Sequence, residues 1–221
     1  MGLSPYKSQL EVWADKSGVS PEKPDSEAMR QGRDLEDYVA RRFTEATGKK
    51  VRRKNEILKS AEYPFMLANV DRLVVGENAG LECKTTSVLN LKRFKNGEYP
   101  AEYYCQCFHY MAVTGFRKWY LAVLVLGAEF RYYEIEWDDE EVNNLIFAEK
   151  DFWGNHVQKQ IPPVPDGSKS AGAAIKSIYP HGEEDNVADL SNYNTDLEKY
   201  ASLDAQIKAS EKEKDAVKQK I

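Results

Sequence analysis

The apolar positions of the chain follow a helical period in several segments. Within residues 26–43 they recur at the spacing of one helix face: Ala28, Leu35, Val39 and Phe43. Similar patterns predict a helix over 101–114 and another over 138–160, where Trp153-Gly154 can break it. From residue 195 onward, a Lys- and Glu-rich tail predicts an amphipathic helix with the apolar residues Leu197, Tyr200, Leu203 and Ile207.

Other segments have the composition of strands. Residues 65–75 are apolar and β-branched and precede the turn-forming sequence 76–80, so we expect a strand, a turn and a second strand that begins at Leu81. Two further β-rich runs cover 117–127 and 129–137. This order of elements predicts an α/β (α+β) fold in which helices flank a central mixed β-sheet.

Charged side chains lie inside this apolar hairpin, in Asn69-Val70-Asp71-Arg72 and Leu81-Glu82-Cys83-Lys84. Side chains alternate faces along a strand, so Glu82 and Lys84 point the same way, roughly 7 Å apart, while Cys83 faces the opposite side. The hairpin can bring Asp71 beside Glu82. A charged residue at the centre of an apolar run indicates a specific role.

Two neighbouring carboxylates repel each other unless a cation lies between them, and hard oxygen ligands suit Mg²⁺ or Mn²⁺ better than zinc. A lysine beside that cation can take a proton from an attacking water or hold the charge that develops on a phosphorane. The pattern therefore indicates metal-dependent phosphodiester hydrolysis. Taken alone, the same spacing is more often found in solvated strand residues that form cross-strand ion pairs. The surrounding motifs must therefore distinguish a metal site from such ion pairs.

Residues on two predicted helices extend the candidate site. Glu36 lies beside the apolar stripe of the first helix, and Gly32 lies one turn earlier, where a missing side chain lets a backbone or phosphate approach. On the helix over 101–114, Gln106 and Tyr110 are four residues apart and share a face. Structural alternatives remain open: Glu36 can be a surface glutamate, and Tyr110 can be a core aromatic.

Five sequences in order carry a family resemblance: GLSPYKSQLEVW, GRDLE, ANVDRLV, GLECKTTS and YYCQCFHYMAVTG. They resemble YqaJ-type phage recombination exonucleases, which are relatives of the lambda exonuclease within the PD-(D/E)XK nuclease superfamily. The resemblance extends from residue 2 to about residue 180. It implies the restriction-endonuclease-like core of that superfamily, followed here by a C-terminal helical tail.

The resemblance also implies roles for individual residues. The implied metal ligands are Asp71, Glu82, the main-chain carbonyl of Cys83 and, in part through water, Glu36. Lys84 is expected to position or deprotonate water, and Gln106 is expected to orient the site. The implied cofactor is Mg²⁺ or Mn²⁺, with two ions.

The activity implied by the resemblance is that of a 5′-to-3′ exonuclease on the ends of linear double-stranded DNA, which leaves 3′ single-stranded tails for recombination. Such enzymes usually form a ring-shaped trimer and work with a phage single-strand annealing protein. Members usually carry a further segment before the GLSPY sequence, with which this chain begins, and that segment helps to grip the 5′ phosphate. We therefore expect an intact metal site and leave recognition of the 5′ phosphate open.

The formal net charge of −5 over 221 residues mildly disfavours a nucleic-acid binder. Two basic clusters, 49–54 and 92–95, provide local positive charge on either side of the candidate site in the sequence. Each cluster can equally well be a solvent-exposed face or a contact to DNA. The candidate DNA-binding residues are Arg33, Arg52, Arg53, Lys54, Thr85, Lys92, Arg93 and Tyr110.

The chain has three cysteines, Cys83, Cys105 and Cys107, and no signal peptide or apolar run of membrane-spanning length. These features predict a location in a reducing cytoplasm, and the resemblance implies a phage or prophage gene in a bacterial host cell. Three cysteines exclude the iron–sulfur members of the superfamily, which need four. Cys105 and His109 share a helix face, but without a second pair of ligands we favour packing over zinc binding.

With 42% hydrophobic residues, the chain can bury one core of about 150–180 residues. The Pro-rich sequence 161–168 marks the edge of the compact unit, and a polar stretch continues to about residue 192. We therefore expect an exonuclease domain over 1–192 and a helical tail over 193–221, truncated relative to the family, that can pair with another helix.

Three functions agree with the sequence. The leading one is a metal-dependent exonuclease. The second is a structure-selective endonuclease on the same fold, which would cut circular DNA. The third is a non-catalytic DNA-binding or assembly remnant of a prophage, in which the tail mediates oligomerisation.

Overall fold

The computed structural model describes residues 2–20, 24–180 and 189–221. The chain consists of two compact units, Met1–Ile178 and Tyr179–Ile221. The elements of the first unit are α1 (Gln9–Ser17), α2 (Glu27–Thr47), β1 (Val51–Arg53), β2 (Leu58–Lys59), β3 (Leu67–Ala68), β4 (Arg72–Val74), β5 (Ala79–Ser87), η1 (Val88–Gly97), α3 (Ala101–Thr114), β6 (Lys118–Leu126), β7 (Glu129–Glu136), α4 (Asp139–Phe152), η2 (Trp153–Val157) and α5 (Lys169–Ile178). The second unit contains η3 (Ser191–Tyr193) and α6 (Asn194–Lys218).

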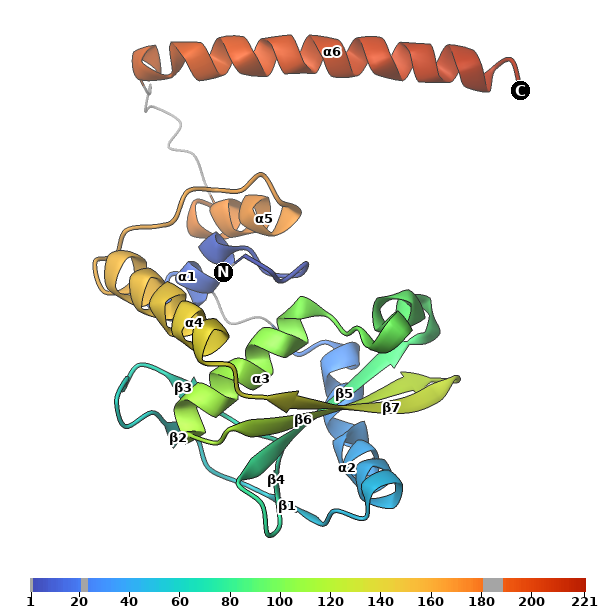
Figure 1. The fold of residues 1–221 in the computed structure, drawn as a ribbon. Helices are drawn as coiled ribbons and strands as arrows, with labels where there is room; N and C mark the ends of the chain where they lie inside the picture. The colour runs from blue at the N-terminus through green and yellow to red at the C-terminus, as the bar shows by residue number, and fades with distance from the viewer. Residues whose placement is uncertain (1, 21–23, 181–188) are drawn as a thin grey trace. The chain divides into compact units, whose positions relative to one another are not determined.

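The first unit has a five-stranded sheet with the order β1-β4-β5-β6-β7 and a separate two-stranded sheet of β2 and β3. β5 and β6 run parallel, whereas the other neighbours in the larger sheet are antiparallel. α3 lies in the connection between the two parallel strands, because such a connection must cross over the sheet. α2 covers one face of the sheet and α3 the other (Figure 1), which confirms the prediction of a mixed sheet flanked by helices.

Two apolar clusters fill the space between the sheet and these helices. Val39 and Phe43 of α2 pack with Leu81 and Tyr120 on one face. On the other face, α3 and α4 pack against a cluster that contains Trp119 and Leu121 of β6. The alternation of side chains along β6 therefore distributes neighbouring residues between the two clusters. The same alternation places the odd and even residues of β5 under different helices.

The prediction of one strand over 65–75 is wrong. The structure has two short strands here: β3 pairs with β2, and β4 begins at Arg72 after a bend at Asp71. The N–H of Cys83 on β5 donates to Oδ2 of Asp71 at 2.8 Å, where a longer β4 would offer a backbone carbonyl. A side-chain hydrogen bond thus replaces the ladder and ends the strand.

The other predicted elements of the first unit agree with the structure within a few residues. The helix over 26–43 is present and continues for one more turn, and the helix over 101–114 has the predicted ends. β5 begins at Ala79 rather than at Leu81, because Ala79 and Gly80 already pair with β6. The helix over 138–160 does not break at Trp153-Gly154 but continues there as the π-helical turn η2.

The first unit extends beyond the Pro-rich sequence 161–168. α5 follows that sequence, and its Ala171 and Ala174 pack against Leu10 and Trp13 of α1. Residues 181–188, within the predicted polar stretch, lie outside the described residues. The predicted tail helix is present as α6. None of the helices in the described part of the chain has the length and apolar character needed to cross a membrane.

Gly80 provides a test of the packing under the central strands. A Cβ atom at Gly80 would lie 2.1 Å from Cζ2 of Trp119, whose side chain is fully buried. Gly80→Ala should therefore lower the free energy of unfolding by about 1–3 kcal/mol, because the strand or the indole must move. Chemical denaturation would measure this change.

Gly172→Ala on α5 is the matched control. Its new Cβ meets no atom within 4 Å, so the free energy of unfolding should stay equal or rise by up to about 1 kcal/mol. Equal effects of both substitutions would contradict the close packing.

Candidate active site

Two carboxylates meet where β4 and β5 join. Asp71 lies in the bend before β4, and Glu82 lies in β5, one position beyond the last pair of residues that the two strands share. Each carboxylate shifts the pKa of the other, so they lie close together. The prediction that the hairpin brings Asp71 beside Glu82 is confirmed.

Glu82 is the more deeply buried of the two acids, with 2% of its surface exposed. Its Oε1 lies 2.5 Å from Nζ of Lys84, while its Oε2 is buried without a hydrogen-bond partner among the described residues. Burial raises the pKa of Glu82 to about 8, against the opposing effect of the Lys84 ammonium, and the negative charge of Asp71 raises it further. A buried polar atom without a partner destabilises the fold, so it marks a position that another group can occupy.

Lys84 lies on the same side of β5 as Glu82, as the strand alternation predicts. Its Nζ also lies 5.3 Å from the centroid of the Tyr103 ring on α3. Burial alone would lower the pKa of Lys84, but the charges of Glu82 and Asp71 outweigh burial and raise it. Lys84 is therefore held as an ammonium group that can stabilise negative charge in the site.

Asp71 is fixed by the backbone of β5. Its Oδ2 accepts the hydrogen bond from the N–H of Cys83, which lowers the pKa of Asp71, but burial has the larger effect and the pKa is raised. The negative charge of Glu36 raises it further. The Cys83 side chain packs with the α2 cluster on the opposite face of the sheet from Glu82, as predicted.

Arg72 connects the strand to the acidic residues of α2. Its side chain is only 5% exposed and forms ion pairs with Glu36 and, at 2.6 Å, with Asp37. The same guanidinium donates to the backbone carbonyl of Asp71 at 2.6 Å. Glu36 therefore lies close enough to Asp71 to influence its pKa, but Glu36 is engaged by Arg72 in this arrangement. Gly32, one turn earlier, faces Thr85 of β5: a Cβ there would lie 4.0 Å from Oγ1.

The site fits a divalent cation by the chemistry of its donors. In the described part of the chain, no three side chains of His, Cys, Asp or Glu gather closely enough to enclose an ion. However, Mg²⁺ in proteins usually keeps several waters and is held by only one or two carboxylates. Asp71 and Glu82 supply two carboxylates, and the unpartnered Oε2 of Glu82 is an available acceptor. A cation beside Oε2 would stabilise the ionised form that burial disfavours.

α3 supplies the polar residues above this part of the sheet. Nε2 of Gln106 donates to the Tyr110 hydroxyl at 2.7 Å, so the predicted shared face is confirmed. Tyr110 is 8% exposed and packs on the Trp119 ring with 5.3 Å between centroids. Burial, and then the charge of Glu82, raise the pKa of Tyr110, so this hydroxyl lies near the acidic pair. Tyr110 is thus a core aromatic, and its burial is inconsistent with the predicted contact to DNA.

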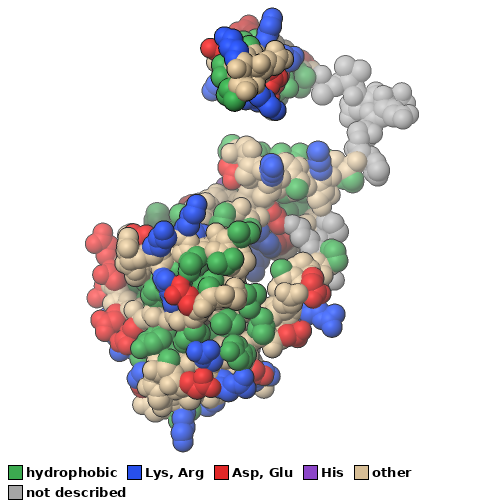
Figure 2. Space-filling view, turned by 90° about the vertical axis from the view of Figure 1, so that its right-hand side faces the viewer, with side chains coloured by type: hydrophobic (Ala, Val, Ile, Leu, Met, Phe, Trp, Pro, Cys, Tyr) green, Lys and Arg blue, Asp and Glu red, His purple; other side chains and the backbone are tan. Residues whose placement is uncertain are grey.

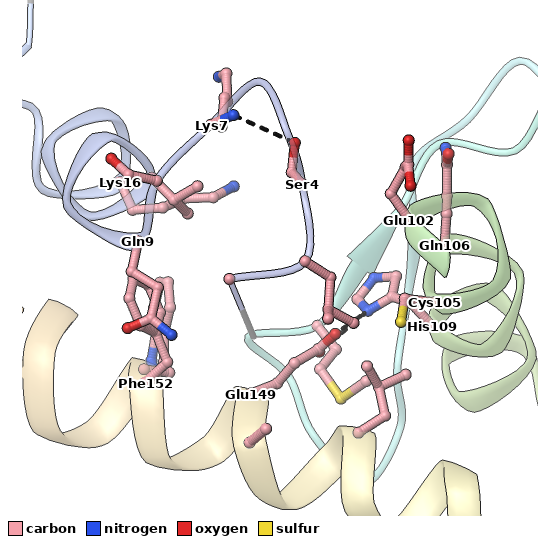
Figure 3. Close-up of a pocket in the computed structure, with 18 of the residues that line it drawn as sticks. Ser4, Lys7, Gln9, Lys16, Glu102, Cys105, Gln106, His109, Glu149 and Phe152 are labelled. Atoms are coloured by element: carbon pink, nitrogen blue, oxygen red, sulfur yellow. Dashed lines mark hydrogen bonds and ion pairs between the residues drawn. The ribbon is translucent and has the colours of Figure 1, made fainter. Parts of the chain in front are cut away.

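A cavity of about 590 Å³ lies on a neighbouring face of α3, where Gln106 forms part of its wall but Tyr110 and the acidic pair do not. It lies between the chain preceding α1, α1 itself, α3 and α4 (Figure 3). The figure shows His109 of α3 and Glu149 of α4 joined across one side. Nδ1 of His109 lies 2.8 Å from Glu149, and Nε2 lies 2.9 Å from the Leu67 carbonyl. Because both ring nitrogens have partners, the structure favours packing over zinc binding for Cys105 and His109.

The predicted DNA-binding residues are distributed unevenly. Four of the cations already have carboxylate partners: Arg33 with Asp25, Arg53 with Asp37, Lys54 with Glu56 and Arg93 with Glu102. Arg52 and Lys92 are exposed and make no ion pair with any residue that the structure describes. Thr85 is half-buried beside Gly32. On the face in Figure 2, Lys and Arg side chains are interspersed with acidic and hydrophobic ones rather than gathered in one patch.

Sequence reasoning missed two residues of the site, Arg72 and Tyr103. Arg72 is a cation within an apolar run directly after Asp71, so the argument applied to Asp71 also applied to it. Tyr103 precedes Gln106 by three residues and Tyr110 by seven, so it lies on the helix face that the prediction already singled out. Both residues could therefore have been found from their spacing.

Solved structures with a similar fold are exonucleases at low sequence identity. LHK-Exo in complex with dAMP is 21% identical with a TM-score of 0.59, over 69% of this chain and 79% of that chain. LHK-Exo, an alkaline exonuclease from Laribacter hongkongensis, is 19% identical with a TM-score of 0.56, over 70% and 89%. A phage-related exonuclease from Haemophilus somnus 129PT is 11% identical with a TM-score of 0.53, over 69% and 82%. At these identities the similarity establishes the fold.

Sequence comparison gives a nearer relative and a family. The protein YqaJ of Bacillus subtilis (strain 168) is 44% identical over 211 residues, which are 94% of this chain and 66% of that protein. The chain thus spans slightly less than two thirds of that relative. The YqaJ-like viral recombinase domain matches residues 1–117, a segment that contains the acidic pair, Lys84 and Gln106. The chain belongs to the family of YqaJ-like viral recombinase domains.

Proposed function

We propose that the chain is a nuclease dependent on Mg²⁺ or Mn²⁺ that degrades linear double-stranded DNA from its 5′ ends and leaves 3′ single-stranded tails. The observation that carries this proposal is the buried, unpartnered Oε2 of Glu82 beside Asp71, with the Lys84 ammonium on the same face of β5. Two carboxylates and a lysine in this order suit metal-assisted hydrolysis of a phosphodiester.

The comparisons support the nuclease part of the proposal. The family is one of viral recombinase domains. The three solved structures described above, which share the fold, are exonucleases by name. The polarity of degradation, the DNA substrate and the dependence on a metal ion are parts of the proposal.

The residues of the site have separable tasks. Asp71 and Glu82 would hold the cation, with the main-chain carbonyl of Cys83 as a further oxygen. A bound Mg²⁺ or Mn²⁺ would supply positive charge beside the phosphoryl oxygens and favour ionisation of the attacking water. Lys84 would donate hydrogen bonds to the attacking water and to the phosphoryl oxygens on which negative charge develops. A second ion is part of the proposal, and it requires Glu36 to exchange its partner Arg72 for the cation.

The preference for an exonuclease over an endonuclease comes from the comparisons. The solved structures of LHK-Exo and of the phage-related exonuclease, which share the fold, are exonucleases by name. Of the residues proposed for the reaction, Gln106 lines the cavity described above, whereas Asp71, Glu82 and Lys84 do not.

The proposal extends to partners known only through the family resemblance. It includes a ring-shaped trimer around DNA, a phage single-strand annealing protein that coats the product tail, and a location in the cytoplasm of the bacterial host. Because the chain spans 66% of its YqaJ relative, these properties belong to the proposal for the whole protein.

Nuclease activity would be measured on linear duplex DNA with 5′ phosphates, labelled at either end, and on closed circular DNA, each with Mg²⁺. The wild type should degrade only the linear DNA and should release the 5′ label first. Glu82→Gln and Lys84→Ala should each lower the rate by about 10²–10³-fold or more, because each removes a charged group from the reacting centre. Glu134→Gln, an exposed glutamate paired with Lys118 at the sheet edge, is the matched control and should retain activity.

Each other result would point to a different function. If the circular DNA is cut, the protein is an endonuclease and the proposed exonuclease function is wrong. Binding of DNA ends without turnover, with or without Glu82→Gln, would indicate a non-catalytic remnant. Release of the 3′ label first would overturn the proposed polarity.

The cation should also be detectable through stability, without DNA. Because the pKa of Glu82 is about 8 in the folded chain and 4.5 in a model peptide, its contribution is most favourable below pH 4.5 and is lost as the pH rises towards 8. In EDTA, Glu82→Gln should therefore be more stable than the wild type by about 1–3 kcal/mol at pH 8, and by less at pH 5. Mg²⁺ should raise the Tm of the wild type and leave that of Glu82→Gln unchanged. Calorimetry at both pH values would test this, and an equal Mg²⁺ effect on both proteins would place the ion elsewhere.

A further inference from the structure

The contact between Lys84 and Tyr103 joins the central strand β5 to α3. Nζ of Lys84 lies over the Tyr103 ring, 5.3 Å from its centroid. An ammonium group within about 6 Å of an aromatic centroid is attracted by the electron-rich face of the ring, and the attraction grows when water is excluded. The side chain of Lys84 is only 23% exposed, so this contact lies largely out of water.

The ring, rather than the hydroxyl, is the part of Tyr103 that contacts Lys84. Among the residues that the structure describes, none forms a hydrogen bond with the Tyr103 hydroxyl. The contact therefore depends on the aromatic face alone, and a phenylalanine at the same position could supply a similar attraction.

The fold holds the Tyr103 ring in place from its other side. The Phe94 ring of η1 lies 6.4 Å from it between centroids, and Phe94 is only 1% exposed. The backbone carbonyl of Phe94 accepts a hydrogen bond from the Arg131 guanidinium of β7. An ion pair of 2.6 Å between Arg93 and Glu102 also joins η1 to the first turn of α3. The position of the ring is thus set by the scaffold.

Glu82 cannot be the main partner of Lys84 once a cation binds. In the described part of the chain, Glu82 is the one carboxylate that forms an ion pair with Lys84. Under the proposed function this same carboxylate binds a divalent cation, whose charge repels the ammonium and weakens the ion pair. The Tyr103 ring is neutral and is not a ligand of the ion, so its attraction for Lys84 persists.

We propose that Tyr103 is a positioning residue that keeps the Lys84 ammonium beside the reacting phosphate while Glu82 binds the divalent cation. The inference rests on the proposed function and assigns a role to a residue outside its motifs. Tyr103 acts through Lys84 and touches neither the ion nor the DNA in this role. Lysine has a long, flexible stem, and restricting it removes conformations in which the amine is too far away to donate to the phosphate.

Steady-state kinetics on linear duplex DNA with Mg²⁺ separates positioning from binding. Tyr103→Leu removes the ring and should lower kcat by about 10–100-fold, because Lys84 loses its position. The KM for DNA should change by less than about threefold, because no DNA contact is removed. Tyr103→Phe keeps the ring and should retain kcat within about threefold.

Tyr63→Leu is the matched control for the loss of a ring. Nζ of Lys150 lies 5.2 Å from the centroid of the Tyr63 ring, in a contact of the same kind that involves none of the proposed site residues. This variant should retain the kcat of the wild type. An unchanged kcat in Tyr103→Leu would overturn the proposal, and so would a loss in Tyr103→Phe as large as in Tyr103→Leu, because the hydroxyl would then be the group that acts.

The contact can also be measured without turnover, by thermal unfolding of the full chain in EDTA. The wild type, Tyr103→Leu, Lys84→Met and the double variant form a cycle that isolates the interaction of the two side chains. Tyr103→Leu should lower the Tm by about 2–4 °C more in the wild-type background than in the Lys84→Met background. The same cycle with Tyr103→Phe should show almost no difference. In Mg²⁺ the difference for Tyr103→Leu should persist.

The two measurements distinguish this inference from the proposed function. Equal Tm losses in both backgrounds would show that the two side chains do not interact and would overturn this inference alone. A Tm difference that disappears in Mg²⁺ would also overturn it, because the ring would then not hold Lys84 beside the ion. A wild-type chain without nuclease activity would overturn the proposed function and the positioning role with it, although the Tm difference in EDTA would remain.

Discussion

The burial of Glu82 beside Asp71 is the constraint on which the rest of the site depends. Two acids in an apolar surrounding destabilise the fold unless other groups compensate for their charge. Lys84 engages one oxygen of Glu82, and the backbone of Cys83 engages Asp71, but the second oxygen of Glu82 has no partner among the described residues. Such an atom lowers the stability of the fold, as groups arranged for binding or catalysis often do.

The sheet topology makes this arrangement possible. Because β5 and β6 are parallel, the chain must cross over the sheet between them, and α3 therefore covers the face to which Glu82 and Lys84 point. This crossover brings the Tyr103 ring to Lys84 and the Gln106–Tyr110 pair to the acids. On the opposite face, α2 supplies Glu36 through Arg72. The site thus combines one strand pair with a helix from each side of the sheet.

Local patterns predicted most of the fold, and long-range contacts account for the rest. The ends of α3 and the strands β6 and β7 follow from periodicity and turn residues, which act within a few positions. The strand over 65–75 could not be predicted correctly, because its interruption depends on a hydrogen bond between Asp71 and Cys83, twelve residues apart. Likewise the spacing placed Glu36 on the correct helix, but its engagement by Arg72 joins residues 36 positions apart.

The electrostatics of the predicted DNA-binding residues limit how tightly a single chain can bind DNA. Most of the predicted DNA-binding cations are held by carboxylates, so phosphate groups must compete with an internal partner for each of them, as with Arg93 and Glu102. The affinity of a single chain for DNA is therefore expected to be modest. The ring-shaped trimer of the proposed function would place several such sets of contacts around one duplex at high effective concentration, which raises the overall affinity beyond that of one chain.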